Sequence, residues 1–103
     1  MTETKEPGPL FRFFETHDWC RFAMAKNAEG ACCTFTDPAA TQFCLVGGLA
    51  AVYHRQGDLV QERVRQALTE AVNERGTNNL AFFNDHVAAS KDDILALLRE
   101  VGV

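Results

Sequence analysis

The alternation of apolar and polar positions predicts a mainly helical chain. Apolar side chains recur at helical spacing over residues 10–24, so we expect a mostly buried first helix there. Pro9, directly before this segment, suits the first turn of a helix. A turn signature at residues 27–30 separates two short segments, 23–26 and 31–35, and this pattern allows a short β-hairpin after the first helix.

A second helix is predicted from Asp37 to Gln56, and it is the most apolar segment of the chain. Asp37 and Pro38 place an N-cap residue before a proline, and Gly57 suits the end of the helix. Because the interior of this segment is apolar nearly all round, we expect it at the centre of the core.

Small residues recur along this predicted helix at spacings of three and four. They form a ridge of Ala40, Cys44, Gly47, Gly48 and Ala51. Two glycines inside a helix cost about 1 kcal/mol each relative to alanine, so a close contact should offset them. A ridge of small residues admits a ring or another backbone. The expected partners are Phe11, Phe14 and Trp19.

The second half of the chain predicts three further helical segments. Asp58 is the expected cap of an amphipathic surface helix over residues 59–75, which Gly76 ends. Residues 80–83 form a short helical turn that ends near Asn84 and Asp85, and a capping-box-like segment at residues 90–93 precedes a last helix over residues 91–101.

The expected fold is therefore mainly α, a compact single domain of four to five helices over residues 9–103. Residues 1–8 are polar and carry two prolines, so we expect a flexible tail there. A chain of 103 residues supports one hydrophobic core but not two.

Charge and hydropathy exclude several classes of protein. Acidic residues outnumber basic ones by 14 to 10, which gives a net charge of −4 and argues against direct binding of a nucleic-acid backbone. No apolar stretch is long enough to span a bilayer, and the N-terminus lacks the basic start and apolar core of a secretory signal. We therefore expect a cytoplasmic protein that does not bind membranes.

The four cysteines are Cys20, Cys32, Cys33 and Cys44, and in a reducing compartment we expect free thiols. Structural zinc sites usually show two close pairs of ligands, which this spacing lacks, although His17 lies three residues before Cys20. We expect neither a metal nor a cofactor, and we expect the thiols to pack as small apolar groups.

The densest polar cluster beside aromatic residues is Asn84, Asp85 and His86. Asp85 and His86 could act as an acid/base pair, but Asn and Asp more commonly cap helix ends and fix turns. These three residues and Trp19 are the candidate binding residues.

A second candidate chemistry is that of a thiol enzyme. Cys44 together with His86 or His54 and Asn84 supplies the residue types of a Cys-His-Asn set. The predicted place of Cys44, two turns into an apolar helix, would raise its pKa and argues against a nucleophile. His54, near the end of the same helix, suits a structural role.

Three motifs in this order resemble an uncharacterised family of small bacterial and phage proteins, known as a domain of unknown function. They are Asp18-Trp19-Cys20 running into the turn at residues 27–30, Cys44-Leu45-Val46-Gly47-Gly48-Leu49, and Phe83-Asn84-Asp85 before a capped last helix. The resemblance covers residues 15–101. Gly48 stands where the family usually has alanine, and Phe83 where it usually has tryptophan. The resemblance supports the fold and implies no chemistry.

Two hypotheses for function follow. The first is a small acidic, non-enzymatic module that binds another protein, in a regulatory or phage–host setting that includes inhibition. The second is a small thiol- or acid/base-dependent enzyme that uses Cys44 and the cluster Asn84-Asp85-His86. The excess of acidic over basic residues and the lack of a complete set of catalytic residues favour the first hypothesis.

Overall fold

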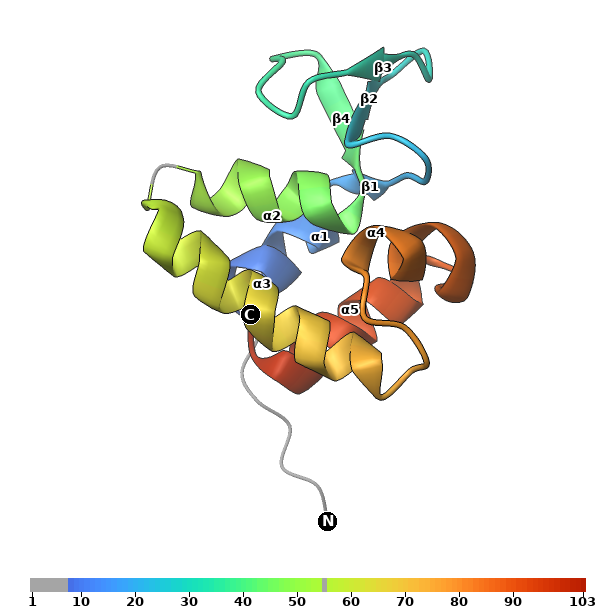
Figure 1. Cartoon of the computed structure of the whole chain (residues 1–103). Helices are drawn as coiled ribbons and strands as arrows, with labels where there is room; N and C mark the ends of the chain where they lie inside the picture. The colour runs from blue at the N-terminus through green and yellow to red at the C-terminus, as the bar shows by residue number, and fades with distance from the viewer. Residues whose placement is uncertain (1–7, 55) are drawn as a thin grey trace.

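A computed structural model describes residues 8–54 and 56–103, and in this part of the chain helices form a body that carries a small sheet at one end (Figure 1). The helices are α1 (Pro9–Thr16), α2 (Leu45–Tyr53), α3 (Asp58–Asn73), α4 (Leu80–Phe82), the π-helical turn η1 (Phe83–Val87) and α5 (Lys91–Val101). The strands are β1 (Asp18–Trp19), β2 (Ala25–Asn27), β3 (Cys32–Cys33) and β4 (Ala40–Phe43). The predominance of helices is confirmed, but the sheet makes the fold mixed α/β.

The core lies between α1, α2, α3 and α5, each of which turns one apolar face inward. The largest fully buried side chains include Leu10 and Phe14 of α1, Leu45 and Leu49 of α2, Leu68 and Val72 of α3, and Ile94, Leu97 and Leu98 of α5. As the sequence predicted, α3 is a surface helix, because only Leu68 and Val72 of it are buried. Residue 103 is bound to the start of α1, because the amides of Leu10 and Phe11 donate to the Val103 carbonyl.

The sheet has the strand order β1-β4-β2-β3. The predicted hairpin is confirmed in part: β2 and β3 pair antiparallel, and the Asn27 carboxamide oxygen accepts from the amides of Glu29 and Ala31 in the turn, but both strands belong to this larger sheet. β4 lies between β2, to which it is antiparallel, and β1, to which it is parallel. The hairpin is therefore one half of a larger sheet.

The predicted start of the second helix is wrong. Asp37 and Pro38 form a tight turn, in which the Asp37 carboxylate accepts from the Ala39 amide, and the next residues form β4. The segment becomes a strand because β1 and β2 hydrogen-bond to it from both sides. The helix begins only after Cys44, which is its N-cap.

The predicted first helix also ends early, because the residues that follow it pair with a strand. α1 stops at Thr16, His17 is extended, and residues 18–19 pair with β4 as β1. The His17 ring stacks on Phe13 at 4.1 Å between centroids, which holds the chain at this exit from the helix. Trp19 therefore lies at the edge of the sheet and not on a helix.

The predicted ridge of small residues is confirmed in part. Ala40 lies in β4 and Cys44 caps α2, so only Gly47, Gly48 and Ala51 are helical. The expected close approach of an aromatic ring is confirmed at Gly48, where an added Cβ would lie 2.5 Å from Cζ of Phe14.

The later elements follow the sequence closely. α3 and α5 have nearly the predicted bounds, and the short helical turn at residues 80–83 continues through η1 to Val87. The predicted cap of α3 is wrong, because Asp58 is the first residue of the helix and Gly57 is its N-cap. The predicted capping box before α5 is not formed: the Ser90 side chain makes no cap bond, and the Asp93 carboxylate accepts from the amide of Ala89, one residue before the N-cap. The tail expected over residues 1–8 lies outside the described residues except for Gly8, the N-cap of α1.

Candidate functional site

Asn84 is a fully buried polar residue that joins three separate segments of the chain. Its Oδ1 accepts from Trp19 Nε1 at 2.6 Å and from the Leu45 amide at 2.9 Å. Its Nδ2 donates to the Cys20 carbonyl at 3.1 Å and to Asp85 Oδ1 at 3.0 Å. A carboxamide offers two donor hydrogens and two acceptor lone pairs, so all of its capacity is used.

The Asn84 carboxamide stands in for a peptide group where β1 and β4 separate. The Cys20 amide still donates to the Phe43 carbonyl, as in a parallel ladder. The next bond of that ladder would join the Leu45 amide to the Cys20 carbonyl, and both groups instead bond to Asn84. Asn84 thereby also caps the first amide of α2, which is the structural role expected of it.

Asp85, the next residue of η1, holds the loop between β1 and β2. Its Oδ1 accepts from the Phe22 amide at 2.9 Å. Phe22 has a φ of 65°, and among residues 8–54 and 56–103 it is the only non-glycine residue with positive φ. A large side chain in this region costs roughly 1–3 kcal/mol, so the rest of the site must enforce it.

Three aromatic side chains gather at this surface. The His86 ring lies 5.6 Å from the Phe22 ring and 4.9 Å from the Phe82 ring, between centroids. Phe22 is 68% exposed and Phe82 is 51% exposed, which is unusual for residues of this size. We call Phe22, Phe82 and His86 the aromatic patch.

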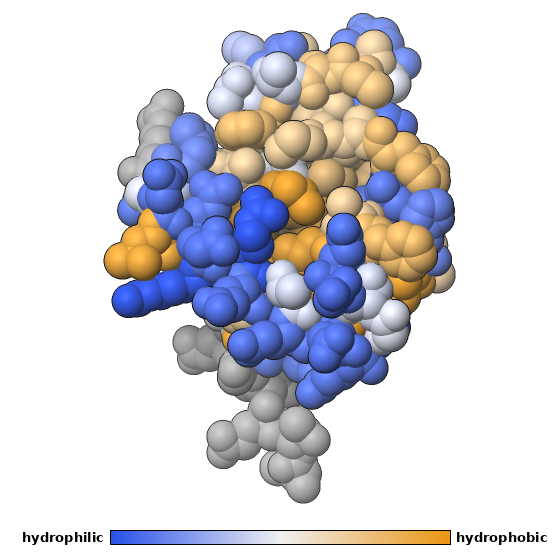
Figure 2. All heavy atoms as spheres, in the orientation of Figure 1, coloured by the Kyte–Doolittle hydropathy of each residue, from blue (hydrophilic) through white to orange (hydrophobic). Residues whose placement is uncertain are grey.

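A cavity of about 230 Å³ opens beside the aromatic patch. It is lined mainly by apolar groups, namely Ala23, Met24, Cys44, Val46 and Ala81, with Asp85 as the charged member. Figure 2 shows tan to orange residues gathered over the β1–β2 loop and α4, whereas α3 and α5 present mainly blue ones. The patch and the cavity together form a continuous apolar site.

Trp19 supports this site through its contacts with Asn84 and Arg21. It is half-buried, its indole N–H is bound to Asn84, and the Arg21 guanidinium lies 4.7 Å from the centre of its ring. The Arg21 guanidinium also donates to the Ala88 carbonyl, which fixes it between the loop and η1. One face of the indole is thus already occupied.

Cys44 does not lie two turns into a helix, as the sequence predicted, but at the N-cap of α2. Its Sγ accepts from the Gly47 amide at 3.2 Å. Burial raises the pKa of the Cys44 thiol, and the bonds from backbone amides oppose this shift only in part. The thiol is therefore protonated at neutral pH despite its place at a helix N-terminus.

The residues of the proposed thiol-enzyme set are not brought together as that chemistry requires. His54 is the C-cap of α2, at the opposite end of the helix from Cys44. The Asn84 carboxamide is fully used by other partners, and in the described part of the chain no hydrogen bond joins Cys44 to His86. A general base that could activate the thiol is therefore not in contact with it.

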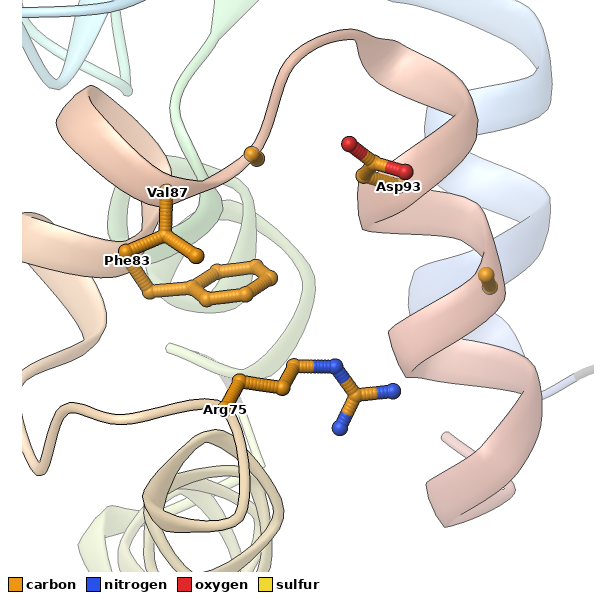
Figure 3. Close-up of a pocket in the computed structure, with 6 residues that line it drawn as sticks. Arg75, Phe83, Val87 and Asp93 are labelled. Atoms are coloured by element: carbon orange, nitrogen blue, oxygen red, sulfur yellow. The ribbon is translucent and has the colours of Figure 1, made fainter.

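A second cavity, of about 250 Å³, lies between α3, η1 and α5. Figure 3 shows the Arg75 side chain extending toward α5 near the Phe83 ring, with Asp93 at the start of α5. Arg75 already donates to the Ala71 carbonyl and pairs with Glu100, and Asp93 accepts from the Ala89 amide. Since both charged groups have partners in the chain, this cavity offers less to a ligand than the apolar site does.

Over 8–54 and 56–103, no three His, Cys, Asp or Glu side chains come close enough together to hold a metal ion. The helices described are also all too short or too polar to cross a bilayer.

The Asp85→Ala variant is expected to unfold with a free energy lower by about 0.5–2 kcal/mol, the usual cost of a lost cap. The substitution removes the acceptor of the Phe22 amide and one partner of Asn84. Urea unfolding followed by circular dichroism measures the change. Glu62→Ala, an exposed position of α3, is the control and should change stability by less than about 0.5 kcal/mol. Equal stability of the two variants would show that Asp85 does not hold the loop.

Comparison with known proteins adds a family but no activity. The model of a family of unknown function, DUF6197, matches residues 12–102. This agrees with the resemblance to an uncharacterised family that the sequence motifs indicate. Neither the curated proteins nor the solved structures contain a match.

Proposed function

The chain belongs to the DUF6197 family of unknown function, and on this premise we propose from the geometry of its site that it is a non-enzymatic protein-binding module. It acts in the cytoplasm as a regulator or inhibitor of the protein that it binds. The aromatic patch and the cavity beside it form the binding surface, with Asn84, Asp85 and Trp19 supporting it from within.

The observation that carries this proposal is the conformation of Phe22. An exposed phenylalanine with positive φ costs free energy both in its backbone and in the contact of its ring with water. The Asp85 carboxylate holds it there. A strained, solvent-exposed aromatic is costly for a fold that needs it only for stability, whereas it suits a side chain that inserts into a partner.

The cavity and the charge define the chemistry of the partner. A cavity of about 230 Å³ with apolar walls admits one aliphatic side chain, such as leucine or methionine. The chain carries a net charge of −4, which favours a partner with a positive surface around that side chain. We therefore expect a protein that presents an aliphatic anchor within a basic surface.

The enzyme hypothesis receives less support. Cys44 is buried and protonated, and the only histidine of the patch packs between two phenylalanine rings. An acid/base pair of Asp85 and His86 would need a polar cleft around it, whereas this cavity is lined mainly by apolar groups.

The Phe22→Gly variant separates binding from stability. Glycine adopts positive φ without strain, so the free energy of unfolding should stay within about 1 kcal/mol of the parent value. Loss of the ring should weaken binding of the partner by at least about tenfold, as for a central interface aromatic. The matched control is Leu59→Ala, because Leu59 is equally exposed, at 66%, but lies at the start of α3.

The partner is sought by affinity capture from the native host with the parent protein and both variants as bait. A protein retained by the parent and by Leu59→Ala, but lost with Phe22→Gly, is then purified and its Kd measured with all three. Equal retention by Phe22→Gly and the parent would contradict the proposal.

A further inference from the structure

Cys20 and Cys44 occupy neighbouring positions where β1 and β4 end. The last register pair of these parallel strands is Trp19 with Phe43, so the next residues, Cys20 and Cys44, follow side by side. The bond from the Cys20 amide to the Phe43 carbonyl, 3.1 Å long, continues the ladder to this point. Because register partners of parallel strands lie on the same face of a sheet, their side chains start in the same direction.

This placement brings the two cysteines to the same point of the sheet. Disulfides join Cα atoms about 4.4–6.8 Å apart, and the bond from the Cys20 amide to the Phe43 carbonyl holds the two strand ends together up to the point where Asn84 separates them. Both thiols are free and nearly buried, with exposures of 6% for Cys20 and 7% for Cys44. Burial raises the pKa of Cys20 to about 11, and the nearby Cys44 thiolate is the next largest cause.

The two sulfurs differ in their access to solvent reagents. Cys44 lines the cavity beside the aromatic patch, and a volume of about 230 Å³ is enough to admit a small oxidant. The Cys20 thiol instead donates to the Ala23 carbonyl inside the loop, at 3.6 Å. Cys44 is therefore placed to react first and Cys20 to react second.

We propose that Cys20 and Cys44 form a dithiol site that a small hydroperoxide oxidises reversibly to an intramolecular disulfide. The Cys44 thiol is protonated at rest, so its proton passes through solvent to the leaving oxygen while the sulfur attacks the other peroxide oxygen; the O–O bond breaks, and a sulfenic acid forms with release of water or an alcohol. The Cys20 sulfur then attacks Cys44 Sγ, and the sulfenic oxygen leaves as a second water with the Cys20 proton. The two thiols together give up two electrons to the peroxide.

The site is tested in a chain that keeps only these two thiols, the Cys32→Ser/Cys33→Ser variant. The folded variant is treated with hydrogen peroxide, alkylated under denaturing conditions and mapped by mass spectrometry. We expect loss of both alkylatable thiols, a mass lower by two hydrogen atoms, a peptide pair linked through Cys20 and Cys44, and recovery of both thiols with dithiothreitol. In a Cys20→Ser chain, dimedone should instead trap a sulfenic acid at Cys44.

Several results would overturn the proposal. They are sulfinic acid at Cys44 without a link to Cys20, a disulfide only between chains, or no reaction until the protein is unfolded. Circular dichroism establishes that the double variant is folded. If it is not, the same peptide map of the parent protein decides, because a link from Cys20 to Cys44 is distinguished there from any link to Cys32 or Cys33.

Discussion

The Asn84→Leu variant is expected to lose about 3–5 kcal/mol of its free energy of unfolding. Leucine has nearly the same size, but it leaves the Leu45 amide, the Cys20 carbonyl and the Trp19 indole N–H without their partner. Each buried polar group that loses its hydrogen bond costs about 1–3 kcal/mol. Urea unfolding followed by circular dichroism and by the fluorescence of Trp19 measures the loss.

The control for this experiment is Asn79→Ala. Asn79 also caps a helix, since its Oδ1 accepts from the Phe82 amide, but it is exposed and makes only this side-chain bond in the described part of the chain. The expected loss is about 0.5–2 kcal/mol. If Asn84→Leu cost no more than Asn79→Ala, the carboxamide would not be the link between β1, α2 and η1.

The Gly47→Ala variant is expected to lose about 2–4 kcal/mol, although alanine favours a helix by about 1 kcal/mol over glycine. An added Cβ at Gly47 would lie 1.9 Å from the carbonyl oxygen of Met24. That oxygen accepts from the Cys44 amide, so it cannot withdraw without breaking the contact between the loop and the start of α2. A fall in Tm of at least about 8 °C is the expected result.

Ala96→Gly on α5 is the reverse exchange and serves as the control. Position 96 is exposed, so only helix propensity acts there, and the expected loss is about 1 kcal/mol. An unchanged or raised Tm of Gly47→Ala would mean that the loop and α2 are not in close contact at this point.

The sequence predicted correctly those elements whose stability is local. α3 and α5 each carry an apolar stripe, and the hairpin turn is made by Asn27 and Gly30. The errors lie at residues 17–24 and 37–44. There the chain becomes β1, a loop and β4 because strands far apart in sequence pair with one another, and helical periodicity contains no information on such pairing.

The same limit applies to the candidate site. The cluster of Asn84 and Asp85 beside aromatic residues was visible in the sequence, as was its role in capping. Phe22 was missed, because it fell within the predicted first helix. The positive φ of Phe22 depends on the carboxylate of Asp85, 63 residues later in the chain, and no neighbouring glycine or turn residue predicts it. A dense set of exposed aromatics can be recognised only once the fold is known.

The Asn84 carboxamide also sets an order on the folding of the chain. It joins Trp19 across 65 positions and the Leu45 amide across 39, so both contacts close long loops. Long loops lose more entropy on closure and slow the folding of the segments that depend on them. During synthesis from the N-terminus, β1 and the first turn of α2 leave the ribosome long before residue 84 does. Their junction can therefore reach its final form only after most of the polypeptide has been made.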